Sequence, residues 1–426
     1  MDAIKNIHKG WFILILITLC NLAALGFARF SFGAILPFMK NGLGLNYQQT
    51  GFLAFSIFLG YLIAVLVAGH FVLIFKAKKV IVFSLFLVST GMVLTASADS
   101  FYIAFIGCFI IGVASGGIYV PSLGLLGQWF TNKSKGMAMG IAMAGSGSGM
   151  VFSGVTVPIL IAQTGTNGWR ISWYILAILV LIIAVTTLLF LKNKPEDLGL
   201  KAISRGQDSI LIQELRNANL DTNVYRNKTM WHLGLIYSTY GLSYLVFTTF
   251  LVDYLIADVG FTNSAAGTFF AIAGITSIIS GLIWGSLSDR FGRLVTLMIV
   301  FFIQSILLLT FSLSSNSTLI LLTTALYGIT LWAVPTIINA GVSDYIHPKF
   351  TTIGMGFVTV FLGIGQLVSP AIIGYLIEYS NSYFTAFLFS SIIALLGALG
   401  CIRLLLNSRK RSEQSGVEIP LKSIDA

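Results

Sequence analysis

Long apolar runs succeed one another along almost the whole chain, separated by short polar turns. A helix needs about 20 apolar residues to cross a bilayer, and every backbone polar group must be satisfied within it. We expect spans at 11–38, 47–75, 79–98, 101–127, 136–163, 170–191, 230–256, 265–287, 294–313, 318–342, 352–377 and 383–406. The first run is longer than a signal-peptide core. The expected fold class is an all-α membrane protein with twelve transmembrane helices.

The composition excludes a soluble globule. Hydrophobic residues make up 56% of the chain and charged residues 9%, whereas soluble domains are about 25% charged. Cys20, Cys108 and Cys401 all lie in apolar runs, so neither a disulfide framework nor a metal-ligand spacing is present in the sequence. We therefore expect packed or lipid-facing thiols, no metal and no cofactor.

The formal charge of +10 reflects basic residues whose positions indicate how the chain is oriented in the membrane. Of the 25 Lys and Arg residues, all but Arg29, Lys40 and Arg170 fall on the side of the N-terminus when the spans alternate. Basic loops stay on the cytoplasmic side of membranes. The pattern predicts a multi-pass protein of the cell membrane with both termini cytoplasmic, in contact with lipid and with no nucleic-acid surface.

The one long polar stretch divides the chain. We expect a six-helix bundle in 1–191, a cytoplasmic linker in 192–229, a second six-helix bundle in 230–406 and a cytoplasmic tail in 407–426. The halves repeat: Gly51 and Gly69 flank the second span eighteen residues apart, as Gly267 and Gly285 flank the eighth. An even number of spans makes the repeats parallel, and such repeats place a binding site near the midplane between them.

An acid and two bases follow the eighth span in a tight turn. Gly285 would permit close helix approach, and Asp289, Arg290 and Arg293 could pair with neighbouring helices. These four residues are expected to form a breakable cytoplasmic gate. The alternative is an ordinary basic loop.

This stretch resembles the signature loop of the major facilitator superfamily, G-x-x-x-D-R-x-G-R. The arrangement of twelve spans with a long middle loop also resembles that of the superfamily, and this resemblance covers essentially the whole chain. The resemblance implies two parallel-repeat six-helix bundles. The first-half copy departs from it, because Leu73 occupies the acidic position and only Lys76, Lys78 and Lys79 remain charged.

Two further segments resemble the monocarboxylate and oxalate–formate porters. These are the sequence from Trp129 through Lys135 to Gly140, before the fifth span, and 193–200, after the sixth. The resemblance implies proton- or solute-coupled movement of a small carboxylate. Porters of these families often carry a cationic residue in the eighth or eleventh span. In this chain those spans, 265–287 and 352–377, contain no Lys or Arg.

Arg29 is the one basic residue well inside a predicted span. It follows Trp11 by eighteen residues, about 27 Å along a helix. A cation at this depth is costly and is a functional candidate by default. Its planar fork suits a carboxylate. The alternative is a structural pair or a clamp on carbonyl groups.

Asp253 lies near the outer end of the seventh span, the repeat counterpart of the first. It is a candidate for proton coupling, either paired with Arg29 or exchanging a proton directly. The alternative is an interfacial carboxylate in water. His70, near the inner end of the second span, is expected to be interfacial.

Side chains with hydroxyl groups lie along the seventh span. Tyr237, Tyr240, Tyr244 and Thr248 recur every three or four residues and share one helical stripe. Tyr240 and Tyr244 are candidates for substrate contact, with ordinary packing as the alternative.

Proline residues mark the fourth and tenth spans. Tyr119 lies beside Pro121 and Trp332 beside Pro335, and a broken helix can free carbonyls next to a central site. The resemblance implies that Tyr119 lines the cavity, as an aromatic of span four does in monocarboxylate-type porters. Gln366 stands in the eleventh span, where relatives place a cation. All three are candidate binding residues, again against ordinary packing.

The fifth span carries glycines between Gly140 and Gly154. No strand precedes them, so they do not form a phosphate-binding loop. Small residues four apart inside an apolar run instead favour close helix packing.

These observations favour a monomeric secondary transporter for a small organic anion, working by alternating access. The alternative is an exporter of amphipathic drugs. A membrane-embedded enzyme would need clustered acid–base or metal-binding groups. The four histidines lie at or outside the ends of the spans, at His8, His70, His232 and His347. We therefore expect no enzyme activity.

Overall fold

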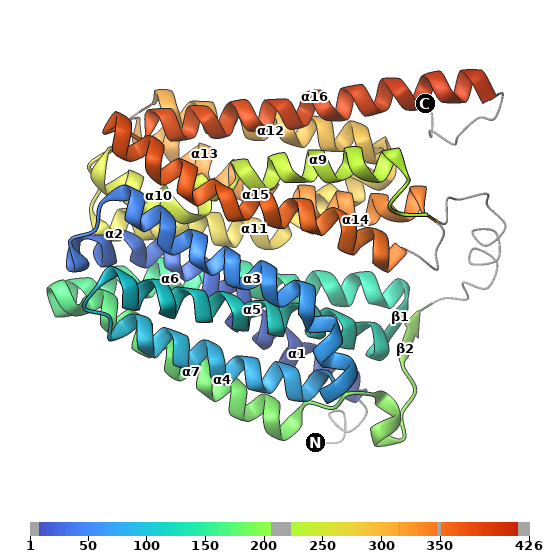
Figure 1. Ribbon diagram of the computed structural model, residues 1–426, viewed down its shortest axis with the longest axis horizontal. Coiled ribbons are helices and arrows are strands. Elements are labelled where there is room, and N and C mark those ends of the chain that lie inside the picture. The colour runs from blue at the N-terminus through green and yellow to red at the C-terminus, as the bar shows by residue number, and fades with distance from the viewer. Residues whose placement is uncertain (1–7, 206–222, 315, 347–350, 416–426) are drawn as a thin grey trace. The chain divides into compact units, whose positions relative to one another are not determined.

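The structure, a computed structural model, describes residues 8–205, 223–314, 316–346 and 351–415 (Figure 1). Within them, eleven helical stretches are long and apolar enough to cross a membrane. One of these, Met137–Phe190, is 54 residues long and contains parts of two helices that a turn at Gly165–Asn167 joins. The expected twelve spans are therefore confirmed.

The first six spans come from eight helical segments. The first span is built from α1 (Lys9–Asn21), the π-helix η2 (Leu22–Phe30) and α2 (Ser31–Leu43), and is followed by α3 (Tyr47–Phe75), α4 (Ala77–Ala96), α5 (Phe101–Trp129), α6 (Lys133–Thr164) and α7 (Gly168–Phe190).

The last six spans also come from eight helices. They are α9 (Lys228–Ser243) with α10 (Leu245–Ala257), α11 (Asn263–Phe291), α12 (Arg293–Leu313), α13 (Ser317–Thr330) with α14 (Ala333–Tyr345), α15 (Thr351–Ser380) and α16 (Phe384–Ser415). The seventh and tenth spans are thus each interrupted part-way, at Tyr244 and at Leu331–Trp332.

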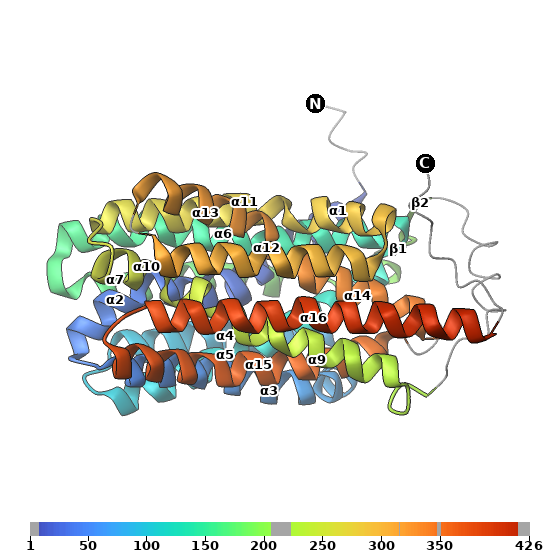
Figure 2. The same ribbon diagram turned by 90° about the horizontal axis from the view of Figure 1, so that it is seen from above.

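Two compact units make up the chain. Unit 1 comprises 1–208 and 248–278, and unit 2 comprises 209–247 and 279–426, so the boundary runs through α10 and α11. Within each unit the helices run roughly parallel or antiparallel to one another, as both views show (Figures 1 and 2). Helices α10 and α11 therefore each contribute residues to both units.

Local signals explain where helices begin and turn. Asn46 caps α3 in a reciprocal box, accepting a hydrogen bond from the Gln49 amide (2.8 Å) while its own amide donates to the Gln49 side chain (3.0 Å). The turn from α11 to α12 uses Gly292 at a φ of 90°, which glycine adopts without strain. Its counterpart between α3 and α4 is Lys76, at a φ of 68°.

The linker contains structure that the sequence did not predict. A short helix, η4 (Pro195–Leu198), precedes strand β2 (Ile203–Arg205), which pairs in parallel with β1 (Phe130–Asn132). The sequence predicted a cytoplasmic linker without a strand, so this pairing adds to that prediction. It forms because β1 exposes unpaired backbone groups between α5 and α6, which the linker satisfies. Residues 206–222 of the predicted linker lie outside the described residues.

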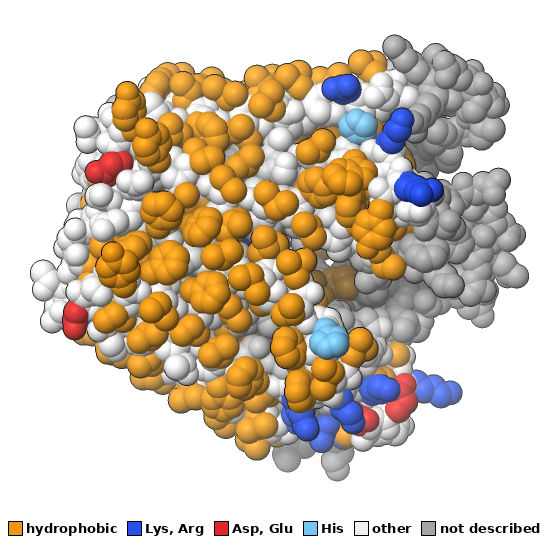
Figure 3. All heavy atoms as spheres, viewed as in Figure 1, with side chains coloured by type: hydrophobic (Ala, Val, Ile, Leu, Met, Phe, Trp, Pro, Cys, Tyr) orange, Lys and Arg blue, Asp and Glu red, His pale blue; other side chains and the backbone are white. Residues whose placement is uncertain are grey.

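Apolar side chains dominate the face of the molecule that Figure 3 shows. Leu66 is 63% and Leu188 48% exposed, which suits contact with lipid rather than water. Cys20, Cys108 and Cys401, in contrast, are each at most 1% exposed. Of the two sequence-based alternatives for the cysteines, the structure shows packed thiols.

Candidate functional site

Arg29 lies in η2, the irregular part of the first span. In a π-helix each backbone hydrogen bond joins residues five positions apart. Here both the amide and the hydroxyl of Ser31 donate to the Gly26 carbonyl. Such segments occur frequently at functional sites. The Arg29 residue is only 8% exposed, so the structure confirms that this cation is buried in the span.

Aromatic rings surround the Arg29 guanidinium. Its central carbon lies 4.6 Å from the ring centre of Phe58 and 4.3 Å from that of Tyr61, both on α3. The Tyr119 ring on α5 lies 6.4 Å from the Tyr61 ring, close enough for its hydroxyl to interact electrostatically with Arg29. Cation–π contacts of this kind hold the plane of a guanidinium in place. The structure therefore brings Arg29 and Tyr119 together.

Glycines of α6 allow that helix to approach η2. A side chain at Gly149 would collide with the backbone of Gly26, and one at Gly145 would lie 2.5 Å from the Thr18 carbonyl oxygen. The expected packing role of the span-five glycines is confirmed for these two positions. Arg29 thus belongs to a segment whose backbone contacts its neighbour directly.

Asp253, on α10, binds Lys40 rather than standing in interfacial water. The Lys40 ammonium lies 2.9 Å and 3.1 Å from the two carboxylate oxygens, and 3.8 Å from the ring centre of Tyr47. The two side chains are 11% and 2% exposed, and both residues belong to unit 1. Lys40 is not among the partners that the sequence suggested for Asp253. Pairing with Arg29 and direct proton exchange stay predictions.

The tyrosine stripe of the seventh span forms a stack in unit 2. The Tyr240 and Tyr244 rings are 4.7 Å apart and nearly parallel, and the Tyr237 ring lies 6.3 Å from that of Tyr240. Gln366 of α15 donates a hydrogen bond of 2.8 Å to the Tyr244 hydroxyl. The structure therefore brings together three candidate residues, Tyr240, Tyr244 and Gln366, in one buried polar cluster.

Tyr240 also completes the break in the tenth span. Because Pro335 has no amide hydrogen, the Leu331 carbonyl four residues before it lacks its helical donor. The Tyr240 hydroxyl donates to that carbonyl instead. The adjacent Trp332 is partly buried, and its backbone amide donates to the Ser280 hydroxyl (3.0 Å).

Two more carbonyls at this break receive side-chain donors. Gln304 of α12 donates to the Thr330 carbonyl at 3.0 Å, and the Trp284 indole of α11 donates to the Ile329 carbonyl at 3.0 Å. The expected freeing of carbonyls is thus seen, but protein side chains occupy them.

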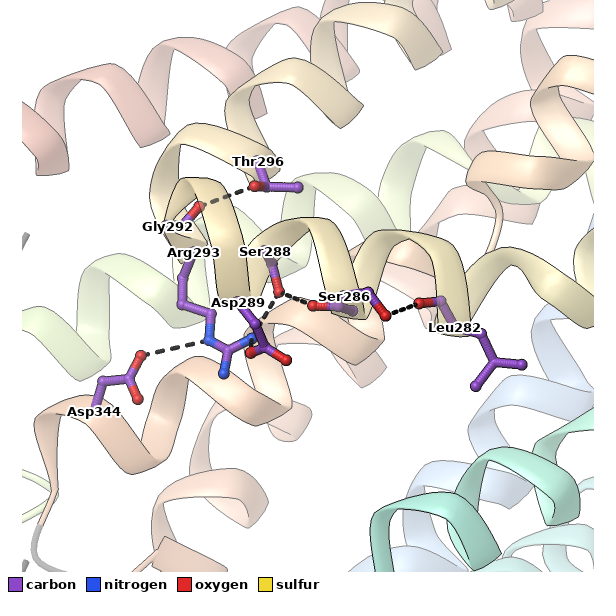
Figure 4. A network of polar contacts seen from close by, with 9 residues as sticks. Leu282, Ser286, Ser288, Asp289, Gly292, Arg293, Thr296 and Asp344 are labelled. Carbon is purple, nitrogen blue, oxygen red and sulfur yellow. Dashed lines mark hydrogen bonds and ion pairs between the residues drawn. The ribbon is translucent and has the colours of Figure 1, made fainter. Parts of the chain in front are cut away.

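The turn after α11 forms a charged cluster with α14 (Figure 4). Arg293 lies 2.6 Å from the Asp289 carboxylate, donates to the Ser288 hydroxyl at 2.6 Å and reaches Asp344 at 3.5 Å. Burial raises the pKa of the Asp344 carboxyl, and the neighbouring Arg293 offsets part of that rise. Arg293 therefore links two acids that come from different helices.

Two other members of the predicted gate take less part. Arg290 is exposed and lies 5.5 Å from the Phe291 ring centre, and no ion pair joins it to any described residue. A methyl group at Gly285 would meet Thr336 at 3.4 Å, an ordinary contact. Close helix approach therefore does not require this glycine in the structure.

Several partners were missed from the sequence. Phe58 and Tyr61 beside Arg29, Lys40 beside Asp253, and Asp344 beside Arg293 all come from other spans. Tyr61 is one of two tyrosines in α3, so its position in the sequence is a weak sign of a functional role. Lys40 lies just beyond the first predicted span, and nothing in the sequence pairs it with Asp253.

Taken together, the apolar spans, the interrupted first, seventh and tenth helices and the buried cation define a polytopic membrane protein with polar groups built into its helices. The family model described as Major Facilitator Superfamily matches residues 18–349 and 233–423. The chain belongs to the major facilitator superfamily and is a transporter, not an enzyme.

Individual relatives are distant but cover most of the chain. A probable sulfoacetate transporter of Cupriavidus necator is 24% identical over 88% of this chain and 89% of its own length. Mouse monocarboxylate transporter 12 is 25% identical (80% and 73%), and a quinolone resistance transporter of Acinetobacter baumannii is 23% identical (91% and 90%). An inward-facing bacterial homologue of the human lysosomal transporter Spinster shares the fold, with a TM-score of 0.72 at 14% identity over 94% and 98% of the two chains.

Proposed function

We propose that this protein is a monomeric secondary transporter that moves a small organic anion across the cell membrane by alternating access, with both termini cytoplasmic. The observation that carries the proposal is the burial of Arg29 in an apolar span beside Phe58 and Tyr61. The names of the sulfoacetate and monocarboxylate relatives support an anionic substrate.

The chemistry of Arg29 favours a carboxylate or sulfonate. Ring contacts engage the flat face of a guanidinium, whereas an oxyanion binds its N–H edge in a bidentate manner. Both interactions are therefore compatible. Tyr61 and Tyr119 add hydroxyl groups near the same charge. In unit 2, Tyr240, Tyr244, Trp332 and Gln366 are the proposed substrate-contacting residues.

Asp253 is the proposed proton-coupling residue. A proton that neutralises its carboxylate would remove one charge of the pair with Lys40 and so weaken the contact between α2 and α10. Coupling of this kind would make transport depend on a pH gradient. In an Asp253→Asn protein, substrate counterflow should persist while uptake driven by an imposed proton gradient is lost.

The substrate class is tested by binding to Arg29 variants. Wild-type, Arg29→Lys and Arg29→Gln proteins are titrated with small carboxylates and sulfonates, including sulfoacetate, by thermal shift. Arg29→Lys keeps the charge but loses the fork, so affinity should fall. Arg29→Gln should lose about 30-fold or more, because removing one member of a buried charged pair costs about 2–5 kcal/mol.

Folding must be separated from binding in this test. A structural Arg29 would lower folding yield and melting temperature in both variants, whatever ligand is added. Unchanged anion affinity in a well-folded Arg29→Gln protein would refute the anion site.

Export of amphipathic drugs is the second candidate. The stacked Tyr237, Tyr240 and Tyr244 rings would suit flat aromatic compounds, and the quinolone resistance relative points the same way. A fluoroquinolone that stabilises the protein when carboxylates without aromatic rings do not would favour this function.

A further inference from the structure

Helices α3, α4 and α5 enclose a groove on the surface of unit 1. Its volume is about 480 Å³, and its lining is apolar except for Lys79 and Ser84. Helices α3 and α4 each pack on α5 but diverge from one another beyond the turn at Lys76. Gly117 forms part of the floor, where a side chain would collide with the Ser84 hydroxyl. The groove therefore lies open between two spans.

The wall of this groove is apolar and exposed, as expected of a surface in contact with lipid. On α3, Val67 is 43% and Phe71 46% exposed, and Phe83 of α4 is 68% exposed. Side chains of this kind exclude a water-soluble ligand without an apolar portion. An acyl chain is the occupant that such a site in a transmembrane region would accept.

Positive charge gathers at one end of the groove. Lys76 and Lys79 are exposed, Lys78 is partly buried, and Lys192 lies close enough to Lys78 for the two charges to repel. None of these lysines forms an ion pair with any described residue. A bound anion would relieve this repulsion.

The second repeat differs at the same place. There Asp289 and Asp344 neutralise Arg293, whereas the first repeat has Leu73, 85% exposed, at the position of the acid. Glu196 and Asp197 of η4 are the acids nearest along the chain to Lys192. No acid among the described residues forms an ion pair with the lysines of the first turn, whereas Arg293 of the second turn pairs with two acids.

Lys76 supplies an independent observation. Its φ of 68° and ψ of 150° lie in a region that essentially only glycine adopts without strain, and the second repeat places Gly292 there, at 90° and 144°. A lysine held in that conformation points to a use for its charge.

We propose that this groove binds an anionic phospholipid, with one acyl chain between α3 and α4 and the phosphate near Lys76 and Lys79. Basic pockets between transmembrane helices at the cytoplasmic surface bind anionic lipid head groups. This site is separate from Arg29, and its test does not depend on transport.

The test titrates delipidated, full-length protein with dioleoyl phosphatidylglycerol and with dioleoyl phosphatidylcholine, and counts bound lipids by native mass spectrometry. Lys79→Gln is compared with Lys201→Gln, an exposed lysine outside the groove. Val67→Trp, which fills the groove, is compared with Leu66→Trp, its neighbour outside the lining. Glycerol 3-phosphate serves as a head group without acyl chains.

Wild-type protein should bind phosphatidylglycerol more tightly than phosphatidylcholine. Lys79→Gln should lower phosphatidylglycerol affinity about fivefold, the contribution of one lysine at a membrane surface. Val67→Trp should weaken both lipids, while both control variants match wild type. Lys76→Gly should bind phosphatidylglycerol less tightly yet melt at a higher temperature, since it removes charge and strain together.

Three results would overturn the proposal. One is equal affinity of wild type for the two lipids, and another is an equal effect of Lys79→Gln and Lys201→Gln. The third is displacement of phosphatidylglycerol by glycerol 3-phosphate at comparable concentration, which would indicate a free-phosphate site. If Val67→Trp protein does not fold, the comparison of Lys79→Gln with Lys201→Gln still decides the outcome.

Discussion

Among single residues, two of the ion pairs in the described part of the chain differ chiefly in burial. Lys40 and Asp253 are almost fully enclosed, whereas Arg170 binds Asp99 at the same distance, 2.9 Å, with the Asp99 side chain 86% exposed. Removal of one member of a buried pair leaves an uncompensated charge, but an exposed partner is readily solvated. The two pairs therefore form a natural comparison.

We expect Asp253→Asn to destabilise the protein by about 3–5 kcal/mol, because Lys40 stays buried without its counter-charge. The double variant Lys40→Met/Asp253→Leu should recover most of this loss, since two apolar residues replace two charges. Asp99→Asn should change stability little. Melting temperatures in one detergent measure all three, and a double variant no more stable than Asp253→Asn would contradict the expectation.

At the scale of helices, the interrupted tenth span shows how a break is stabilised. Tyr240, Gln304 and Trp284 each donate to one of three successive carbonyls at the break. A buried carbonyl without a donor costs free energy, so these side chains allow the helix to end and restart within the membrane. Side-chain donors from three other helices thus stabilise the break.

Tyr240→Phe should destabilise the protein by about 1–3 kcal/mol, because the Leu331 carbonyl loses its donor. Pro335→Ala would restore a backbone donor for the same carbonyl, so the loss from Tyr240→Phe should be smaller in a Pro335→Ala background. Tyr375→Phe, at a tyrosine that is 53% exposed, is the control. Additive losses in the double variant would mean that the hydroxyl is not replacing the missing amide.

For the whole molecule, the cluster around Arg293 is expected to control the rate of conformational change. Asp289→Asn removes the shorter of the two carboxylate contacts of Arg293 while leaving the substrate-binding residues intact. It should therefore slow transport in proteoliposomes several-fold and leave ligand affinity nearly unchanged.

The matched control for this prediction is Arg290→Gln, because Arg290 forms no ion pair with any described residue. Its transport rate should stay near that of wild type. Normal transport by Asp289→Asn, or equal slowing by both variants, would remove the cluster from the gating mechanism.

The twelve spans could be predicted because run length and lipid leave a chain few alternatives. Arg29 could be identified because a cation in an apolar run is conspicuous. The π-helix around it could not, and neither could the close approach of Gly26 in this segment to Gly149 of another span. Lys40 with Asp253, and Tyr240 with Leu331, join spans far apart in sequence, and periodicity within one span does not encode such pairs.

The burial of all three native thiols has a practical consequence. Cys20, Cys108 and Cys401 should be unreactive toward maleimides in the folded protein, since thiol reactivity requires access as well as a thiolate. The unmodified chain can then serve directly as the background for single-cysteine labelling. Fluorophores or spin labels introduced at exposed positions would report on distances during the transport cycle without first removing the natural cysteines.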